Sequence, residues 1–171
     1  NDAPKKTIMQ QRLVECVPNI SEGRRNEVIE AVAAVVSQVE GVRLLDVDPG
    51  KSTNRTVSTF VGPPETIGEA AFQLIKKAAE LIDMRQHRGE HPRMGATDVC
   101  PFVPVSGVSM EECVEIARAL AKRVGDELAI PGYLYESAAL IEERQNLATC
   151  RKGQYEGLAK LETLAGKPDF G

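Results

Sequence analysis

Apolar positions in the first third of the chain alternate between the spacing of strands and the spacing of helices. Compact apolar runs at residues 13–17 and 42–47 predict two strands, the first ended by Pro18 and the second by residues 48–50. Residues 55–61 have a period of two, with Val57, Thr59 and Val61 on one side and Thr56, Ser58 and Phe60 on the other. This pattern predicts a third strand that forms a hairpin with the second.

Three helices are predicted from apolar residues that recur three or four positions apart. We expect the first to be capped by Ser21 and to end at Gly41. The second covers about residues 64–83, and the third runs from an S-x-x-E capping box at 109–112 to about residue 129. The expected inward positions are, in chain order, Ile29, Val32, Ala33 and Val36; Ile67, Ala71, Leu74, Ala78 and Ile82; and Val114, Ala117, Leu120 and Val124.

Two further strands complete the prediction. Residues 99–105 contain two prolines, which place this strand at a sheet edge or at a bulge, and residues 131–135 predict a last short strand. The order is β-α-β-β-α-β followed by α-β-α, and its first six elements match the ferredoxin-like split βαβ arrangement. We therefore predict an α+β fold with a mixed sheet and helices on one face. Residues 12–171 form one domain by length, after a polar leader at 1–11.

Charge and cysteine content narrow the class of protein. Asp and Glu total 25 against 21 Lys and Arg, and this acidic balance argues against general nucleic-acid binding. No apolar run approaches the roughly 18 residues of a membrane helix. The four cysteines show no C-x-x-C spacing, and we interpret them as buried thiols of a cytoplasmic protein: Cys16, Cys100, Cys113 and Cys150.

Both histidines lie in one segment, residues 87–95 (HRGEHPRMG). Histidine can move protons near neutral pH, and the neighbouring arginines can hold a carboxylate with paired donors. The glycines and the proline indicate a shaped loop. On an acidic protein, this basic segment indicates a histidine-dependent site for a small anion, in an enzyme or in a ligand-binding protein.

Other interpretations of these residues remain open. His87-Arg88-Gly89-Glu90-His91 also satisfies the zinc motif H-x-x-E-H, although Gly89 and Pro92 disfavour the helix that this motif needs. Either histidine could also be an ordinary loop residue.

Two polar segments follow predicted strands. We expect the carboxylates of Asp46 and Asp48 on opposite sides of their strand, so that one faces a site as a general base or orients a histidine. On pattern alone, Asp48 is better explained as a turn residue. Residues 18–23 could bind an anion through backbone N–H groups at a helix start, or simply form a capped turn.

Six motifs together resemble the amino-terminal part of the glutamate formiminotransferase family. They are residues 13–23 (LVECVPNISEG), 44–48 (LLDVD), 52–57 (STNRTV), 89–96 (GEHPRMGA), 98–105 (DVCPFVPV) and 107–110 (GVSM). The resemblance covers about residues 12–171. It implies transfer of the formimino group of N-formimino-L-glutamate to tetrahydrofolate as co-substrate, in histidine degradation and one-carbon metabolism, with no metal expected.

The resemblance also implies site residues and partners. It places the catalytic histidine at His91 and a conserved aspartate at Asp48. We expect His91 to relay a proton between the two nitrogens and Asp48 to orient the imidazole or a water. Residues expected to bind substrate are Asn19, Arg55, Glu90, Arg93 and Gly171. The family enzymes are homodimers, whose two similar subdomains form a groove that holds folate.

The resemblance further implies that this chain corresponds to the amino-terminal subdomain and that Gly171 lies where the family's folate-binding loop begins. We therefore expect either a fragment or one half of a split enzyme whose carboxy-terminal subdomain is a separate chain. The alternatives to formimino transfer are a non-catalytic folate-binding or regulatory module and, third, a zinc hydrolase that uses the histidine segment.

Overall fold

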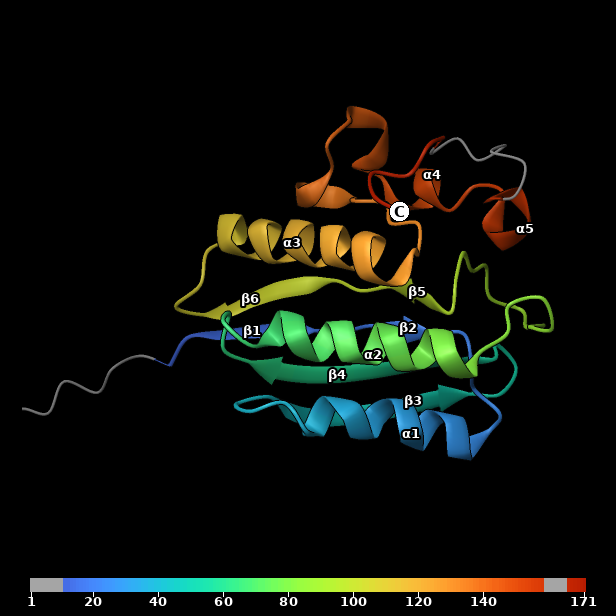
Figure 1. Cartoon of the computed structure of the whole chain (residues 1–171), viewed down its shortest axis with the longest axis horizontal. Helices are drawn as coiled ribbons and strands as arrows, with labels where there is room; N and C mark the ends of the chain where they lie inside the picture. The colour runs from blue at the N-terminus through green and yellow to red at the C-terminus, as the bar shows by residue number, and fades with distance from the viewer. Residues whose placement is uncertain (1–10, 159–165) are drawn as a thin grey trace, which may run out of the picture.

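The computed structural model describes residues 11–158 and 166–171, so most of the predicted polar leader lies outside the described residues. The elements are β1 (Leu13–Cys16), β2 (Asn19–Ile20), α1 (Asn26–Ser37), β3 (Arg43–Gly50), β4 (Arg55–Gly62), α2 (Ile67–Leu81), β5 (Thr97–Val99), β6 (Phe102–Ser106), α3 (Met110–Leu128), α4 (Leu147–Cys150) and α5 (Gln154–Leu158). The long strands and the helices α1, α2 and α3 run roughly along the long axis of the molecule (Figure 1). Two 3₁₀ turns, Glu136–Ala138 and Glu142–Arg144, precede α4.

Every strand pairing between described residues is antiparallel, so the prediction of a mixed sheet was wrong. Strand β4 pairs with β3 along one side and with β1 and β2 along the other. Strands β6 and β5 then pair with β1 and β2, respectively. The sheet therefore has four rows of strands, two of which are interrupted.

Prolines explain these interruptions, which the sequence analysis missed. Proline has no N–H to donate to a ladder, and Pro18 and Pro101 lie at the two breaks. The N–H of Val17 still donates to the carbonyl of Pro101 at 3.3 Å, so the broken rows stay adjacent. Pro49 and Pro104 are tolerated within β3 and β6 because each of these strands pairs on one side only.

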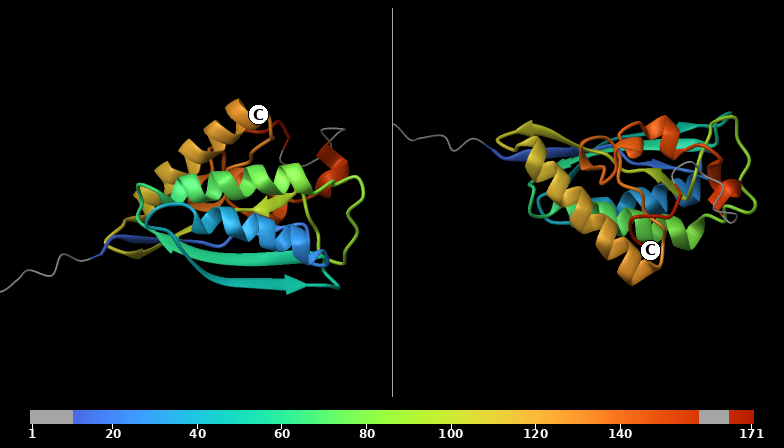
Figure 2. Two further views of the ribbon diagram at one scale, coloured as in Figure 1. Left: turned by 60° about the horizontal axis from the view of Figure 1, so that its bottom comes forward. Right: turned by 90° about the horizontal axis from the view of Figure 1, so that it is seen from above.

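Helices α1, α2 and α3 lie on the same face of the sheet, as expected (Figure 2). Their buried apolar residues form one core with the sheet, and on β4 the buried residues Thr56, Ser58 and Phe60 alternate with half-buried ones as predicted. All five inward positions predicted for the second helix are buried, although Ile82 follows the end of α2, whereas Ala33 in α1 is half-buried. Val114 and Ala117 in α3 are also only half-buried, whereas Leu120 and Val124 are buried as predicted.

The starts of the helices differ in how well they were predicted. Ser109 and Glu112 form the predicted capping box of α3. Ser21 does not cap α1, because this helix begins five residues later and the Ser21 hydroxyl donates to the carbonyl of Gly95 at 2.7 Å. The carboxylate of Glu22 instead accepts the backbone N–H groups of Arg24 and Arg25, each at 2.9 Å.

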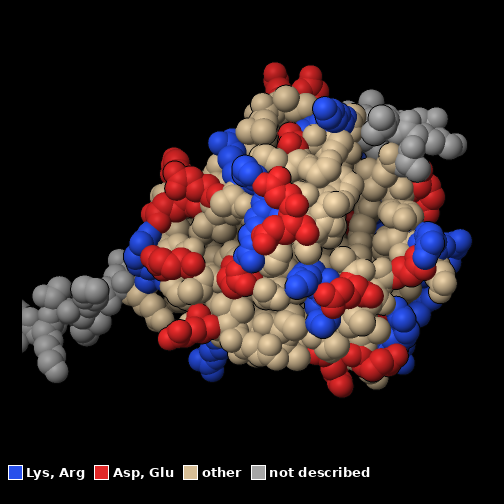
Figure 3. Space-filling model, viewed as in Figure 1, with Lys and Arg blue, Asp and Glu red and all other residues tan. Residues whose placement is uncertain are grey.

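The strand predicted at 131–135 is absent from the described structure. Gly132 forms one isolated antiparallel bridge with Phe170, and the surrounding chain is irregular. Acidic and basic side chains are interspersed on the face shown in Figure 3. Among residues 11–158 and 166–171, no helix combines the length and hydropathy needed to cross a bilayer.

Candidate active site

Three polar segments meet at one end of the sheet. They are the connection from β2 to α1, the turn from β3 to β4, and the segment between α2 and β5 that contains both histidines, residues 83–96 (called here the histidine loop). Asn54 connects all three, because its Oδ1 accepts the N–H of Gly23 and its Nδ2 donates to the carbonyl of Arg88, both at 2.9 Å. Asn54 has a φ of 49°, a left-handed conformation that asparagine tolerates better than most residues.

The histidine loop lies directly against the β3–β4 turn. The N–H of Glu90 donates to the carbonyl of Ser52 at 3.2 Å. A Cβ atom at Gly89 would lie 2.2 Å from the carbonyl oxygen of Thr53, so a larger residue cannot occupy this position without moving the loop. The turn therefore determines where the histidine loop lies.

His87 is buried and both of its ring nitrogens are engaged. Arginine has donors only, so the Nε–H of Arg93 donates to His87 Nδ1, at 3.0 Å. The proton of His87 must then be on Nε2, which donates to the carbonyl of Asn54 at 2.9 Å. His87 is thus a neutral imidazole that links the loop to the turn.

His91 has the opposite arrangement. Its Nε2 lies 2.7 Å from Nη1 of Arg55 and must accept that N–H, because a guanidinium has no lone pair to offer. Its Nδ1 carries the proton and donates to the carbonyl of Pro92 at 2.6 Å. His91 is only half-buried, so this imidazole is the more accessible of the two.

Strand register brings other predicted residues to the same place. Asp48 and Asn19 both lie opposite Val57, and Arg55 lies two residues before Val57 on β4. Directly paired residues and residues two apart share a side of the sheet. Asp48, Asn19 and Arg55 therefore lie on the sheet face opposite the helices, defined by Val57, Thr59 and Val61 and called here the open face.

Register also corrects one expectation about the two aspartates. Asp46 lies opposite Thr59, and Asp48 lies opposite Val57, so both carboxylates are on the open face. The expectation that they would point to opposite sides was wrong, because side chains two residues apart in a strand share a side.

Arg93 belongs to the histidine loop and its side chain is buried. It forms an ion pair with Glu156 of α5, at 2.7 Å between Nη2 and Oε1. The guanidinium of Arg93 donates to the Glu156 carboxylate and lowers its pKa to about 2. The N–H of Tyr155 also donates to the carbonyl of Arg93 at 2.9 Å. Arg93 thereby attaches α5 to the histidine loop.

A second perturbed carboxylate supports the β2–α1 connection. Burial alone would raise the pKa of Glu22, but hydrogen bonds from the N–H groups of Arg25 and Arg24 and from the Arg25 guanidinium outweigh it and lower the pKa. The backbone carbonyl of Glu22 accepts the hydroxyl of Thr56 at 2.5 Å. Glu22 thus holds the connection against β4.

Comparison with known proteins identifies the family. Residues 13–171 match the family model described as formiminotransferase domain, N-terminal subdomain. The chain belongs to the formiminotransferase family. This confirms the resemblance inferred from the sequence motifs.

Three relatives illustrate how much of a formiminotransferase the chain represents. It is 57% identical to the formimidoyltransferase-cyclodeaminase of Gallus gallus, over 94% of this chain and 30% of that protein. It is 53% identical to the glutamate formimidoyltransferase of Streptococcus pyogenes serotype M1, over 94% of this chain and 54% of that protein. A formiminotransferase cyclodeaminase-like protein of Arabidopsis thaliana is 31% identical, over 96% of this chain and 60% of that protein. The chain spans less than two thirds of the length of each relative.

The remaining predicted site residues of this formiminotransferase subdomain differ in how close they lie to the His91–Arg55 contact, and Arg93 lines the same small crevice as Arg55 and His91. The side chain of Glu90 is exposed on the histidine loop, and Arg93 is engaged by Glu156 and His87. Gly171 packs against Ile130 and Pro131, just beyond α3.

The geometry does not support the zinc interpretation. The segment from His87 to His91 is irregular rather than helical, and both nitrogens of His87 are hydrogen-bonded to protein atoms. Within residues 11–158 and 166–171, no group of three or more His, Cys, Asp or Glu side chains could hold a metal ion.

Sequence reasoning missed Asp98, whose carboxylate supports the loop from behind. Its Oδ1 accepts the N–H of Met94 at 2.6 Å, and its Oδ2 forms an ion pair with Arg151. Asp98 borders both the crevice beside His91 and a larger cavity of about 1010 Å³. A carboxylate within a motif next to a histidine loop is the only signal that could have drawn attention to it.

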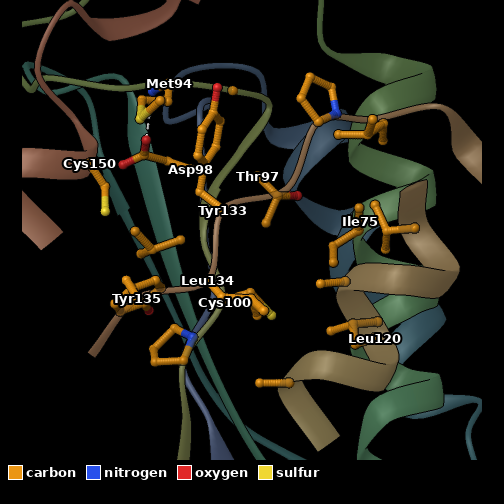
Figure 4. Close-up of a pocket in the computed structure, with 18 of the residues that line it drawn as sticks. Ile75, Met94, Thr97, Asp98, Cys100, Leu120, Tyr133, Leu134, Tyr135 and Cys150 are labelled. Atoms are coloured by element: carbon orange, nitrogen blue, oxygen red, sulfur yellow. Dashed lines mark hydrogen bonds between the residues drawn. The ribbon is translucent and has the colours of Figure 1, made fainter. Parts of the chain in front are cut away.

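The larger cavity lies on the helix side of the sheet, between α2, α3, β5 and the chain after α3. Its walls are mainly apolar, as the close-up in Figure 4 shows for Ile75, Leu120 and Leu134. Burial raises the pKa of Tyr135, another lining residue, so its phenol stays protonated. Neither histidine lines this cavity.

Proposed function

We propose that the chain is the amino-terminal half of a glutamate formimidoyltransferase, which moves the formimino group of N-formimino-L-glutamate to tetrahydrofolate. The observation that carries this proposal is the half-buried His91, whose Nε2 meets Arg55 on the face that also bears Asp48. The reaction is taken from the names of the relatives, and His91, Arg55 and Asp48 are the groups proposed to carry it out.

The reaction needs one group that can accept and return a proton. N5 of tetrahydrofolate attacks the amidine carbon and forms a tetrahedral intermediate, and N5 then loses a proton. Nε2 of His91 accepts that proton and delivers it to the glutamate nitrogen, whose bond to the carbon breaks as the nitrogen keeps the electron pair. The products are 5-formiminotetrahydrofolate and L-glutamate. A neutral imidazole is suited to both transfers near neutral pH.

The other residues on the open face have complementary roles in this proposal. Arg55 binds a substrate carboxylate through paired N–H donors, and Asn19 offers a side-chain amide in the next row of the sheet. Asp48 orients a water or the imidazole. Glu90 contacts substrate from the exposed edge of the loop. Arg93 acts indirectly, because its donors already hold His87 and Glu156.

Further partners belong to the same proposal. A carboxy-terminal subdomain, on the same or a separate chain, covers the open face and completes the folate groove, with Gly171 at the start of the folate loop. The functional unit is a homodimer with no nucleic-acid or membrane partner. All four cysteines are free thiols, which favours the reducing cytoplasm. The row order β3, β4, β1/β2, β6/β5 favours the ferredoxin-like arrangement.

The decisive experiment is a transfer assay with N-formimino-L-glutamate and tetrahydrofolate, in which both products are measured by mass spectrometry. The chain is tested alone and with the carboxy-terminal half of the Streptococcus pyogenes relative supplied as a second chain. Transfer that requires the second chain supports an enzyme half with an incomplete groove. No transfer in either mixture, with both chains folded, contradicts the enzyme and favours a folate-binding or regulatory module.

A further inference from the structure

The contact between Arg55 and His91 hinders the action of His91 as a general base. A base needs a free lone pair, and the only lone pair of His91 is on Nε2, because Nδ1 carries the proton donated to Pro92. That lone pair already accepts an N–H of Arg55 at 2.7 Å. In the free chain, the nitrogen that would receive a proton is therefore occupied.

The same arginine opposes the charge that catalysis would create. Once His91 is protonated, its imidazolium faces a guanidinium within hydrogen-bonding distance, and two cations at that distance repel each other. A carboxylate bound to Arg55 would remove both obstacles. A carboxylate carries a full negative charge and can accept two parallel N–H groups of the guanidinium, whereas the neutral imidazole offers one lone pair, so a carboxylate competes well for Arg55.

We propose that Arg55 masks His91 until a carboxylate of the substrate draws the guanidinium away, so that the base is released only by an anionic amidine. This rests on the proposed function and adds a selection step to it. Arg55 is half-buried at the start of β4, where pairing with Gly50 holds its backbone while the side chain can change partner. The hydrogen bond from Nδ1 to Pro92 persists, and it keeps Nε2 directed toward the open face.

The proton count follows the proposed reaction. With Arg55 on the carboxylate, Nε2 accepts the proton from N5 after the new carbon–nitrogen bond has formed. It returns the same proton to the glutamate nitrogen as the old carbon–nitrogen bond breaks. When L-glutamate leaves, Arg55 can return to the neutral imidazole.

Masking is testable on the isolated chain without any turnover. Diethyl pyrocarbonate acylates an unprotonated imidazole nitrogen that has a free lone pair, and peptide mass spectrometry reads the two histidines separately. We expect Arg55→Met to raise the modification rate of His91 by about tenfold or more, as for loss of a charge-assisted hydrogen bond. Arg55→Lys retains a hydrogen-bond donor, so the modification rate of His91 should stay low.

Arg43→Met is the matched control, because Arg43 pairs with Val61 at the far end of the same hairpin. It should leave the His91 rate unchanged. His87 should stay unreactive in every variant that keeps the fold, which makes it an internal test of folding. Equal His91 rates in the parent chain and in Arg55→Met would overturn the masking contact.

Release by substrate is tested by kinetics in the two-chain enzyme with formamidine, which is an amidine without a carboxylate. If Arg55 masks the base, Arg55→Met transfers from formamidine several-fold faster than the parent, although it is slower with N-formimino-L-glutamate. If Arg55 only binds the carboxylate, both enzymes use formamidine equally, and release is refuted. If no variant transfers from either substrate, both the proposed function and the release of His91 by substrate are contradicted. The modification rates of His91 would still decide whether Arg55 masks it.

Discussion

The Nε–H of Arg93 donates to Nδ1 of His87 at 3.0 Å, so the two histidines of this chain carry their protons on opposite ring nitrogens. His87 is 6% exposed and satisfies one buried donor and one buried carbonyl, whereas His91 is only half-buried. The two histidines of this loop thus differ in their contacts. His87 holds the loop in place, whereas His91 lies at the surface of the loop.

Removal of His87 should therefore reduce stability. His87→Ala leaves the Nε–H of Arg93 and the carbonyl of Asn54 without their partner, and an unsatisfied buried group costs about 1–3 kcal/mol. We expect urea unfolding to show a loss of that size. His91→Ala is the matched variant and should lose clearly less; equal losses would mean that His87 is not the link between loop and turn.

Removal of His91 should instead reduce turnover. In the two-chain enzyme, His91→Asn should lower kcat by about 10²–10⁴-fold, the usual contribution of proton transfer by a positioned side chain. Gln86→Ala changes an exposed residue of the same loop and should leave kcat unchanged. A loss of less than about tenfold in His91→Asn, with normal unfolding, would remove His91 from the proton relay.

Two glycines of the histidine loop should differ sharply. A Cβ at Gly89 would lie 2.2 Å from the carbonyl oxygen of Thr53, whereas the nearest atom to a Cβ at Gly95 is the carbonyl oxygen of Thr97 at 3.6 Å, an ordinary contact. Gly89→Ala must separate the loop from the β3–β4 turn, and we expect lower stability and faster amide exchange at Glu90. Gly95→Ala should leave both unchanged, and identical behaviour of the two variants would show that the turn does not position the loop.

The buried thiols should react slowly. Burial raises the pKa of Cys16, and its contact with Cys100, at 3.6 Å between the sulfur atoms, raises it further. Burial also raises the pKa of Cys150. Because the thiolate is the reactive form, iodoacetamide should alkylate both at least about tenfold more slowly in the native chain than in urea. Fast native labelling of Cys16 would contradict its placement in the core.

Local patterns predicted the helices well because apolar spacing reports directly on burial. The buried positions of the second helix and the capping box of α3 could be inferred from neighbouring residues alone. The broken strand rows could not, since a proline shows where a ladder stops but not whether the strand resumes beyond it. Pro18 and Pro101 are such cases.

The candidate site shows the same limit. His91 and Asp48 were inferred from local motifs and the family resemblance, and their roles stay predictions. The contact between His91 and Arg55 joins residues 36 positions apart, and it depends on the β3–β4 turn and the histidine loop lying together. The separate role of His87 depends in turn on Arg93, whose donors could not be assigned before its neighbours were known.

The ion pair between Arg93 and Glu156 should make stability depend on acid pH. Glu156 has a pKa of about 2 in the folded chain, because Arg93 donates to its carboxylate, against about 4.3 for an unperturbed glutamate. A lowered folded pKa stabilises the fold above the unfolded pKa, and this contribution is lost as the pH falls from about 4.5 toward 2. The side chain of Glu156 is 63% exposed, so solvent and salt should keep the effect small.

Comparison of two variants isolates this contribution. Glu156→Gln should unfold more easily than the parent near pH 6, and the difference should shrink at about pH 3 and in high salt. Glu143→Gln, at an exposed glutamate of the second 3₁₀ turn, should match the parent under all these conditions. A difference between parent and Glu156→Gln that is independent of pH would mean that Arg93 holds α5 through shape and hydrogen bonding rather than through the charge of Glu156.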